Sequence, residues 1–173
     1  MGLKTAKMNY HAAQQQESNW CWAASIQMAL SAKGIAVSQE EIVQNAFGRI
    51  VDRPGSPEEI LASLNGWTLN GQGQRLQVAG TVGLGPPPFA ILKRQLETGT
   101  PVIVGYENPE GEVGHAVVVT AVIYEMTERG PQIQRVMVRD PWPSLSDSSG
   151  KRELSAGEFA RVRAYYVIET MQF

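Results

Sequence analysis

The chain contains a single cysteine, Cys21, and the sequence changes character at that residue. Residues 14–20 are mostly polar, whereas the segment from Cys21 to about Ala32 is apolar and rich in helix-forming residues. Gly34 follows closely and can terminate a helix through a left-handed backbone conformation. The pattern therefore predicts a helix that begins at Cys21 and buries residues such as Leu30 on one face.

A cysteine at a helix N-terminus has a distinctive chemistry. The helix dipole and the unpaired N–H groups at that end favour negative charge, so they favour the nucleophilic thiolate over the thiol. Environments of this kind bring a cysteine pKa down to roughly 3.5–7.5. Taken alone, however, a cysteine between Trp20 and Trp22 is also typical of a core residue, because free cysteines are among the most buried residues.

A nucleophilic thiol needs a base, and His115 is the better of the two histidines for that role. It follows Gly114 and opens a β-branched run over 116–124 that is typical of a buried strand. His11 is the alternative base, but it lies in the polar segment 1–14, which we expect to be irregular. That segment offers no strand to fix the ring, so we expect His11 to be solvated.

Asp140 is the predicted partner that orients the imidazole. It follows the apparent strand 133–139 and opens the turn Asp140-Pro141-Trp142-Pro143. In an antiparallel meander the start of one strand lies near the end of the next, which would place His115 beside Asp140. The alternative is that Asp140 only starts a turn before proline. We expect Trp142 to pack over the site and shield it from water.

A tetrahedral intermediate also needs hydrogen-bond donors for its oxyanion. The backbone N–H of Cys21 and the side-chain amide of Gln15 are the candidates. Gln14 and Gln16 flank Gln15, so either could take its place.

Taken together, these segments resemble the papain-like cysteine peptidases, and most closely the compact bacterial branch of AvrRpt2-type effector proteases and C39-like peptidases. The order Gln, Cys, His, Asp matches and spans about residues 14–143. The resemblance implies that Cys21 is the nucleophile, His115 the general base and acid, Asp140 the orienting residue and Gln15 the oxyanion donor.

The resemblance also implies an α+β, papain-like fold. Its N-terminal helical half, at about 15–98, would pack on a C-terminal antiparallel sheet at about 99–173, with the active site between them. A chain of 173 residues with 43% hydrophobic composition suits one domain over 1–173.

Further elements follow from local signals. Ser38 and Ser56 each precede a glutamate by three residues, which is a capping box that starts a helix. Further helices are expected at 89–97 and from about 155, and strands at 101–106 and 164–169. The Gly-, Gln- and Pro-rich segment 70–88 is expected to form a surface loop, with a wall of the substrate cleft as the alternative.

Several classes of function are disfavoured by composition. The net charge of −2 gives no basic surface for nucleic acid or an anionic membrane, and Lys151-Arg152 is expected to be a solvated pair. No residue cluster has metal-ligand spacing, and no cofactor is expected. Residues 1–8 lack the apolar core of a secretory signal, so we expect a protein that stays in the cytoplasm of its producer or is delivered by specialised secretion.

The predicted function is a cysteine endopeptidase that cleaves peptide bonds of a protein substrate through Cys21, His115 and Asp140. A bacterial secreted effector or antibacterial toxin is the expected role, and a toxin would have a cognate immunity or inhibitor protein as its partner. The alternatives are a deamidase or acyltransferase on the same residues, a leader-peptide-processing peptidase, or a non-catalytic papain-like binding module.

Overall fold

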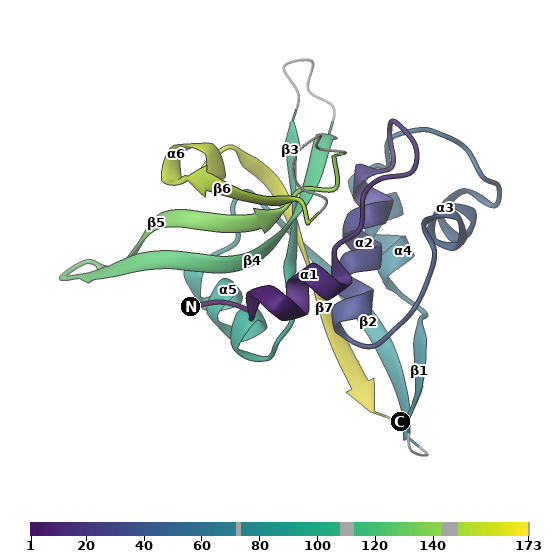
Figure 1. The fold of residues 1–173 in the computed structure, drawn as a ribbon, viewed down its shortest axis with the longest axis horizontal. Coiled ribbons are helices and arrows are strands. Elements are labelled where there is room, and N and C mark those ends of the chain that lie inside the picture. The colour runs from purple at the N-terminus through teal and green to yellow at the C-terminus, as the bar shows by residue number, and fades with distance from the viewer. Residues whose placement is uncertain (72–73, 108–112, 143–148, 173) are drawn as a thin grey trace.

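The computed structural model describes residues 1–71, 74–107, 113–142 and 149–172, which form six helices and seven strands (Figure 1). The helices are α1 (Thr5–His11), α2 (Cys21–Ala32), α3 (Gln39–Phe47), α4 (Pro57–Leu64), α5 (Phe89–Glu97) and α6 (Ala156–Phe159). The strands are β1 (Thr68–Gly71), β2 (Gln74–Leu84), β3 (Val102–Glu107), β4 (Val113–Thr127), β5 (Gly130–Arg139), β6 (Lys151–Ser155) and β7 (Val162–Gln172). The protein is α+β, as the sequence predicted.

Local sequence signals set where the helices begin. α2 begins at Cys21 as predicted. At α3, the Ser38 hydroxyl accepts a hydrogen bond from the Glu41 N–H at 3.1 Å, and the Glu41 carboxylate accepts one from the Ser38 N–H at 2.7 Å. Ser56 and Glu59 form the same reciprocal pair at α4. Both predicted capping boxes are therefore confirmed.

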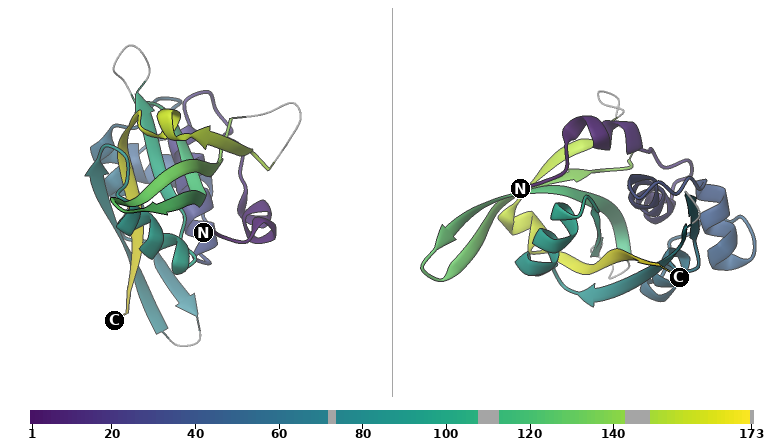
Figure 2. Two further views of the ribbon diagram at one scale, coloured as in Figure 1. Left: turned by 90° about the vertical axis from the view of Figure 1, so that its left-hand side faces the viewer. Right: turned by 90° about the horizontal axis from the view of Figure 1, so that it is seen from below.

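The described strands form one antiparallel sheet in the order β1-β2-β7-β3-β4-β5-β6. The C-terminal strand β7 lies between β2 and β3, so it joins the early hairpin to the later meander. β4 and β5 extend away from α2, α3 and α4 as a long hairpin (Figure 1). Figure 2 shows that the sheet is strongly twisted between its two ends.

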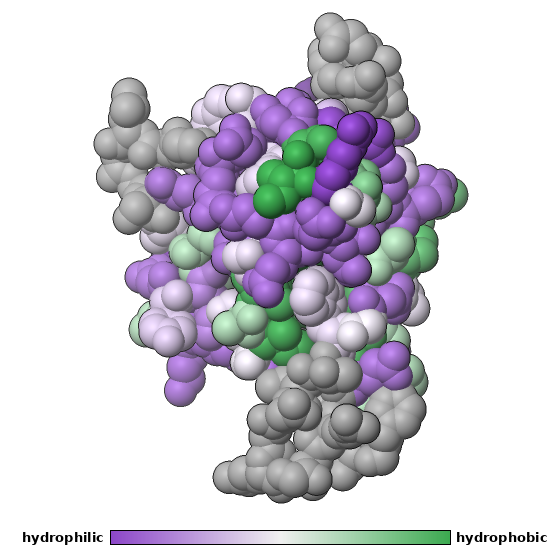
Figure 3. Space-filling model, turned by 90° about the vertical axis from the view of Figure 1, so that its right-hand side faces the viewer, coloured by the Kyte–Doolittle hydropathy of each residue, from purple (hydrophilic) through white to green (hydrophobic). Residues whose placement is uncertain are grey.

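Helices cover both faces of this sheet. Helices α2 and α4 pack on the face that carries Ala116 and Val118 of β4, and α3 packs against these two helices. α5 and α6 pack on the face that carries Val117 and Val119. Alternate residues of β4 thus enter two different cores, which explains why its sequence is continuously apolar over 116–119. Outside, the surface over α3 and α4 is mostly hydrophilic and its apolar areas are separate (Figure 3).

The N-terminal segment differs from the expectation that residues 1–14 are irregular. It contains α1, whose Met8 is fully buried. Before α1 the chain pairs with β4, where the Leu3 N–H donates to the Thr120 carbonyl at 2.8 Å and Gly2 forms a bridge to Ala121. This helix depends on tertiary packing, because a seven-residue helix is marginal by itself.

Residues 70–88 also differ from the prediction of a surface loop. Most of this segment is β2, which pairs with β7 along its length, so β1 and β2 belong to the sheet although they fall within 15–98. The high glycine content has a packing reason. A Cβ atom at Gly80 would lie 2.6 Å from the Cβ atom of Leu64, so glycine permits the close approach of α4 to β2.

We therefore expect Gly80→Ala to lower the free energy of unfolding by about 1–3 kcal/mol, as overpacking of a core usually does. The matched control is Gly157→Ala in α6, where an added Cβ would find Ser155 Oγ only at 3.9 Å. That variant should be neutral or slightly stabilising. Urea denaturation measures both variants, and a Gly80→Ala protein as stable as the wild type would contradict this explanation of α4 packing.

Candidate active site

Cys21 is the first residue of α2 and is buried, with 8% of its surface exposed. The preceding residue, Trp20, provides no side-chain cap for the helix. The N–H groups of the first turn therefore keep their partial positive charge for another acceptor. This is the helix-terminal setting that the sequence predicted for the thiol.

His115 and Asp140 are hydrogen-bonded, with His115 Nε2 and Asp140 Oδ1 2.7 Å apart. The other ring nitrogen, Nδ1, is then free of Asp140, and His115 and Cys21 line one pocket, where their interaction contributes to the raised pKa of His115. Both members of the His115–Asp140 pair are largely shielded, with 27% and 15% of their side chains exposed. The structure thus brings together the three residues that the sequence singled out.

Strand pairing explains the proximity of His115 and Asp140. β4 and β5 are antiparallel, and Val118 pairs with Arg139. The next residue, Asp140, therefore continues opposite Val117, two residues from His115. Residues in this diagonal relation share a face of the sheet and are within reach of long side chains.

The surroundings of His115 and Asp140 favour the charged form of each side chain. Burial alone would lower the pKa of His115, but hydrogen bonds and charge interactions with Asp140 and Cys21 outweigh it and raise that pKa to about 9. Burial would raise the pKa of Asp140, but the interactions with His115, the Trp142 N–H and Arg152 hold it below its usual range. The imidazole is therefore expected to be protonated and the carboxylate ionised near neutral pH.

The backbone also fixes Asp140. Its carboxylate Oδ1 accepts a second hydrogen bond from the Trp142 N–H at 2.9 Å, and its own N–H donates to the Gly150 carbonyl at 2.8 Å. Gly150 has a φ of +62°, and a Cβ atom there would lie 2.2 Å from the Asp140 carbonyl oxygen. Only glycine fits this close contact without strain.

Gln15 is the one of the three candidate glutamines that is buried and lines the pocket beside Cys21, whereas Gln14 and Gln16 are exposed. Its side-chain nitrogen donates to the carbonyls of Glu17 at 2.9 Å and Ser18 at 2.8 Å. Within the described residues its side-chain oxygen has no hydrogen-bond partner. Its role as an oxyanion donor stays a prediction, because both N–H groups of the amide are engaged.

A pocket of about 100 Å³ opens beside Cys21 and His115. Its other lining residues are Gln15, Ser18, Asn19, Trp22, Pro54, Gly55, Gly114, Ala116 and Trp142. Pro54 and Gly55 form one wall, and they come from the α3–α4 loop. Residues 77–88 do not line this pocket, so it gives no support to the alternative that 70–88 forms a wall of the cleft.

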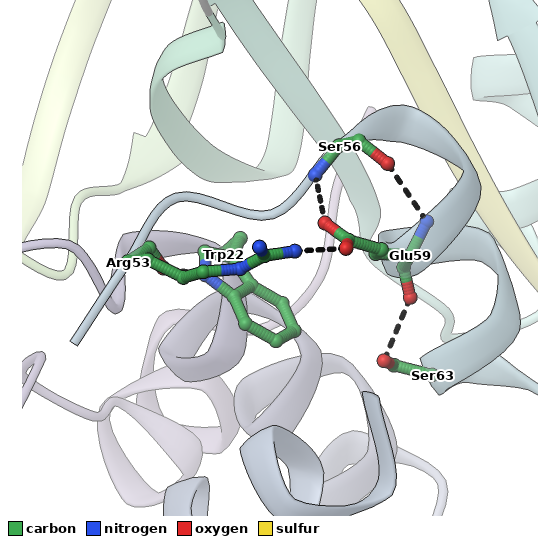
Figure 4. Close-up of polar contacts among 5 residues, drawn as sticks. All are labelled: Trp22, Arg53, Ser56, Glu59 and Ser63. Atoms are coloured by element: carbon green, nitrogen blue, oxygen red, sulfur yellow. Dashed lines mark hydrogen bonds and ion pairs between the residues drawn. The ribbon is translucent and has the colours of Figure 1, made fainter. Parts of the chain in front are cut away.

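The two tryptophans beside the cysteine hold this wall in place. Trp20 Nε1 donates to the Val51 carbonyl at 2.9 Å, and Trp22 Nε1 donates to the Arg53 carbonyl at 3.3 Å. Figure 4 shows the Arg53 side chain directed at Glu59, with which it forms an ion pair at the start of α4. Sequence reasoning missed this wall, because the segment before α4 has no periodic pattern.

The remaining candidates lie elsewhere or differ in detail. His11 hydrogen-bonds Ser31 at 2.7 Å. Ser31 lies ten residues along α2 from Cys21, which is about 15 Å of helix, so His11 is not at the site.

Trp142 lines the pocket but is 57% exposed, so it does not shield the site as a packed residue. No group of three or more potential metal ligands is found among the described residues.

The two histidines give a direct test of these electrostatics. We expect His115 to titrate near pH 9, whereas burial and the nearby Lys7 hold the pKa of His11 below 6.5. Because the pKa of His115 is raised by folding, its charge stabilises the folded state fully below about pH 6.5, and this contribution is lost as the pH rises through about 9. NMR titration of both rings, with Asp140→Asn as control, measures the shifts. Two titrations near 6.5 would contradict these assignments.

Comparison with known proteins agrees with this arrangement. Residues 7–171 match the model of the Peptidase_C39 like family. One similar solved structure is the peptidase domain of Streptococcus ComA, a bi-functional ABC transporter involved in a quorum sensing pathway. It shares 14% identity with a TM-score of 0.58, over 91% of this chain and 95% of that one, and so shows the fold. No curated protein matches the chain. The chain therefore belongs to the C39-like peptidase family, whose fold is papain-like.

Proposed function

We propose that this protein is a cysteine endopeptidase that cleaves a protein or peptide substrate. Cys21 would be the nucleophile, His115 the general base and acid, and Asp140 the orienting residue. Family membership supports cysteine protease activity in general. The observation that carries the assignment to these residues is that the imidazole hydrogen-bonded to Asp140 lines the same pocket as Cys21.

The geometry supports a conventional acyl-transfer sequence. In the resting site the Cys21 proton already lies on His115, and the thiolate sulfur attacks the carbonyl carbon of the substrate. The tetrahedral intermediate collapses when the C–N bond breaks and His115 donates its proton to the leaving amine. Water, deprotonated by His115, then attacks the thioester, and Cys21 leaves as the thiolate. A pKa of about 9 keeps the proton on the imidazole until the amine needs it.

The oxyanion would lie at the N-terminus of α2. The Cys21 N–H is the simpler donor, because this helix end has no side-chain cap. Gln15 can contribute only by exchanging one of its bonds to the Glu17 or Ser18 carbonyl. Its backbone N–H donates to the Pro141 carbonyl at 2.8 Å, which ties this segment to the turn that holds Asp140.

The pocket favours small residues next to the scissile bond. Its volume of about 100 Å³ is well below the roughly 300–1,000 Å³ of pockets that enclose drug-sized ligands. Gly55, Gly114 and Ala116 line it, and a Cβ atom at Gly55 would already lie 3.1 Å from the Trp22 ring. We therefore propose a substrate with glycine or another small residue beside the cleaved bond.

Two finer proposals rest on the resemblance and on family membership. Leader-peptide processing is the second candidate function, and the narrow pocket favours it over a broad digestive peptidase. An AvrRpt2-type effector or antibacterial toxin with a cognate immunity protein, acting after specialised secretion, remains a prediction about biological role. Tight binding of a protein encoded by a neighbouring gene, which blocks the pocket, would support the toxin proposal, and harmless expression of the active enzyme would contradict it.

Among the described helices, none has both the length and the apolar character needed to span a bilayer.

The proposed function is tested with a peptide library that varies the residues beside one peptide bond. We expect the wild type to release two fragments, with preference for small residues at that bond, and Cys21→Ala to reduce the rate by a factor on the order of 10⁴ or more. Mass spectrometry distinguishes this from conversion of an amide to an acid, which would indicate a deamidase. Equal turnover by wild type and Cys21→Ala would contradict the proposal.

A further inference from the structure

The Asp140 carboxylate has a partner on each of its oxygen atoms. Oδ1 accepts hydrogen bonds from His115 Nε2 at 2.7 Å and from the Trp142 N–H at 2.9 Å. Oδ2 lies 3.3 Å from Nε of Arg152 on β6. Contacts on both oxygens restrict rotation of the carboxylate. His115 takes part in the proposed reaction and Trp142 contributes only its backbone N–H, so Arg152 is the partner side chain that still has no role.

Strand pairing places Arg152 in line with the candidate site. Arg152 pairs with Val138 across β5 and β6, so it is the diagonal neighbour of Asp140 on the same face of the sheet. His115 stands in the same relation to Asp140 on the other side, through β4. His115 of β4, Asp140 just after β5 and Arg152 of β6 thus form one row. Arg152 is exposed, in agreement with the prediction of a solvated pair, but it also forms an ion pair with Asp140 that the sequence did not reveal.

We propose that Arg152 is a positioning residue, whose guanidinium holds the Asp140 carboxylate in the orientation in which Oδ1 accepts the hydrogen bond from His115. The inference rests on the proposed peptidase function and adds a residue to it. Arg152 touches neither Cys21 nor the substrate pocket, so it acts through Asp140 alone.

The other ionisable groups around Asp140 do not replace this contact. Tyr106 of β3 has a buried hydroxyl and a pKa raised by burial to about 12, so it stays neutral. Glu158 of α6 carries a negative charge near Arg152, and its carboxylate caps Ser155. The adjacent Arg139 is buried and donates to the Ser149 and Thr5 carbonyls. Cys21 is among the groups that shift the pKa of His115 but is not among those that shift the pKa of Asp140.

The size of the effect follows from exposure and geometry. Arg152 is 48% exposed, so solvent screens much of its direct charge interaction with Asp140. Loss of orientation has the greater effect on the rate, because small displacements of catalytic groups can cost up to about 10²-fold. We therefore expect Arg152→Gln to lower kcat/KM at neutral pH by about tenfold, within that range.

The experiment compares wild type, Arg152→Gln and Arg152→Lys by peptide hydrolysis and by iodoacetamide alkylation of Cys21 across pH. In Arg152→Gln the carboxylate loses a cation and is more easily protonated, so the acid limb of both profiles should move to higher pH. Arg152→Lys keeps the charge and should keep the acid limb near its wild-type position. The matched control is Arg135→Gln, which removes an exposed ion pair to Glu153 across the same two strands, with N–O distance 3.2 Å, and should leave both profiles unchanged.

Wild-type profiles in Arg152→Gln, or the same displacement in Arg135→Gln, would overturn the positioning role. Failure of the proposed peptidase function can be told apart from failure of the positioning role. If the wild-type protein cleaves no peptide, the pH profile of Cys21 alkylation can still be measured. A displaced acid limb of alkylation in Arg152→Gln would then support the positioning role without hydrolysis.

Discussion

The hydrogen bond between His115 and Asp140 is the contact on which the rest of the candidate site depends. It holds the imidazole by Nε2 and leaves the other ring nitrogen free of Asp140, at the pocket that His115 shares with Cys21. It also offsets the burial that would otherwise discharge the ring, and the pKa of His115 rises to about 9 as a result. Without the carboxylate, a buried imidazole beside a buried thiol would tend to stay neutral.

The scaffold around this bond is built from two kinds of contact. The antiparallel register of β4 and β5 brings His115 and Asp140 together, and the N-terminus of α2 presents Cys21 to them. Hydrogen bonds from the indoles of Trp20 and Trp22 then fix the α3–α4 loop as the opposite wall. The tryptophans that could have indicated simple core packing therefore both bury the cysteine and shape the pocket beside it.

Sequence patterns predicted the features that depend on local chemistry. These include the start of α2 at Cys21, the capping boxes at Ser38 and Ser56, and the proximity of His115 to Asp140, which needed only an antiparallel meander. They did not predict α1 and β2, because tertiary packing stabilises a short helix and because the glycines of β2 serve close contact rather than a turn. Arg152 was missed because the sequence predicted no strand at 151–155, so no pairing placed it beside Asp140.

The central claim is that Cys21 and His115 form a reactive thiolate–imidazolium pair. The rate of Cys21 alkylation against pH, in the wild type and in His115→Ala, tests it most directly. We expect fast alkylation that persists well below pH 7 and is lost in the variant, because the imidazolium stabilises the thiolate. Slow alkylation that rises only near pH 8–9, as for an ordinary thiol, and that is unchanged in His115→Ala would contradict this claim and leave a papain-like fold without this chemistry.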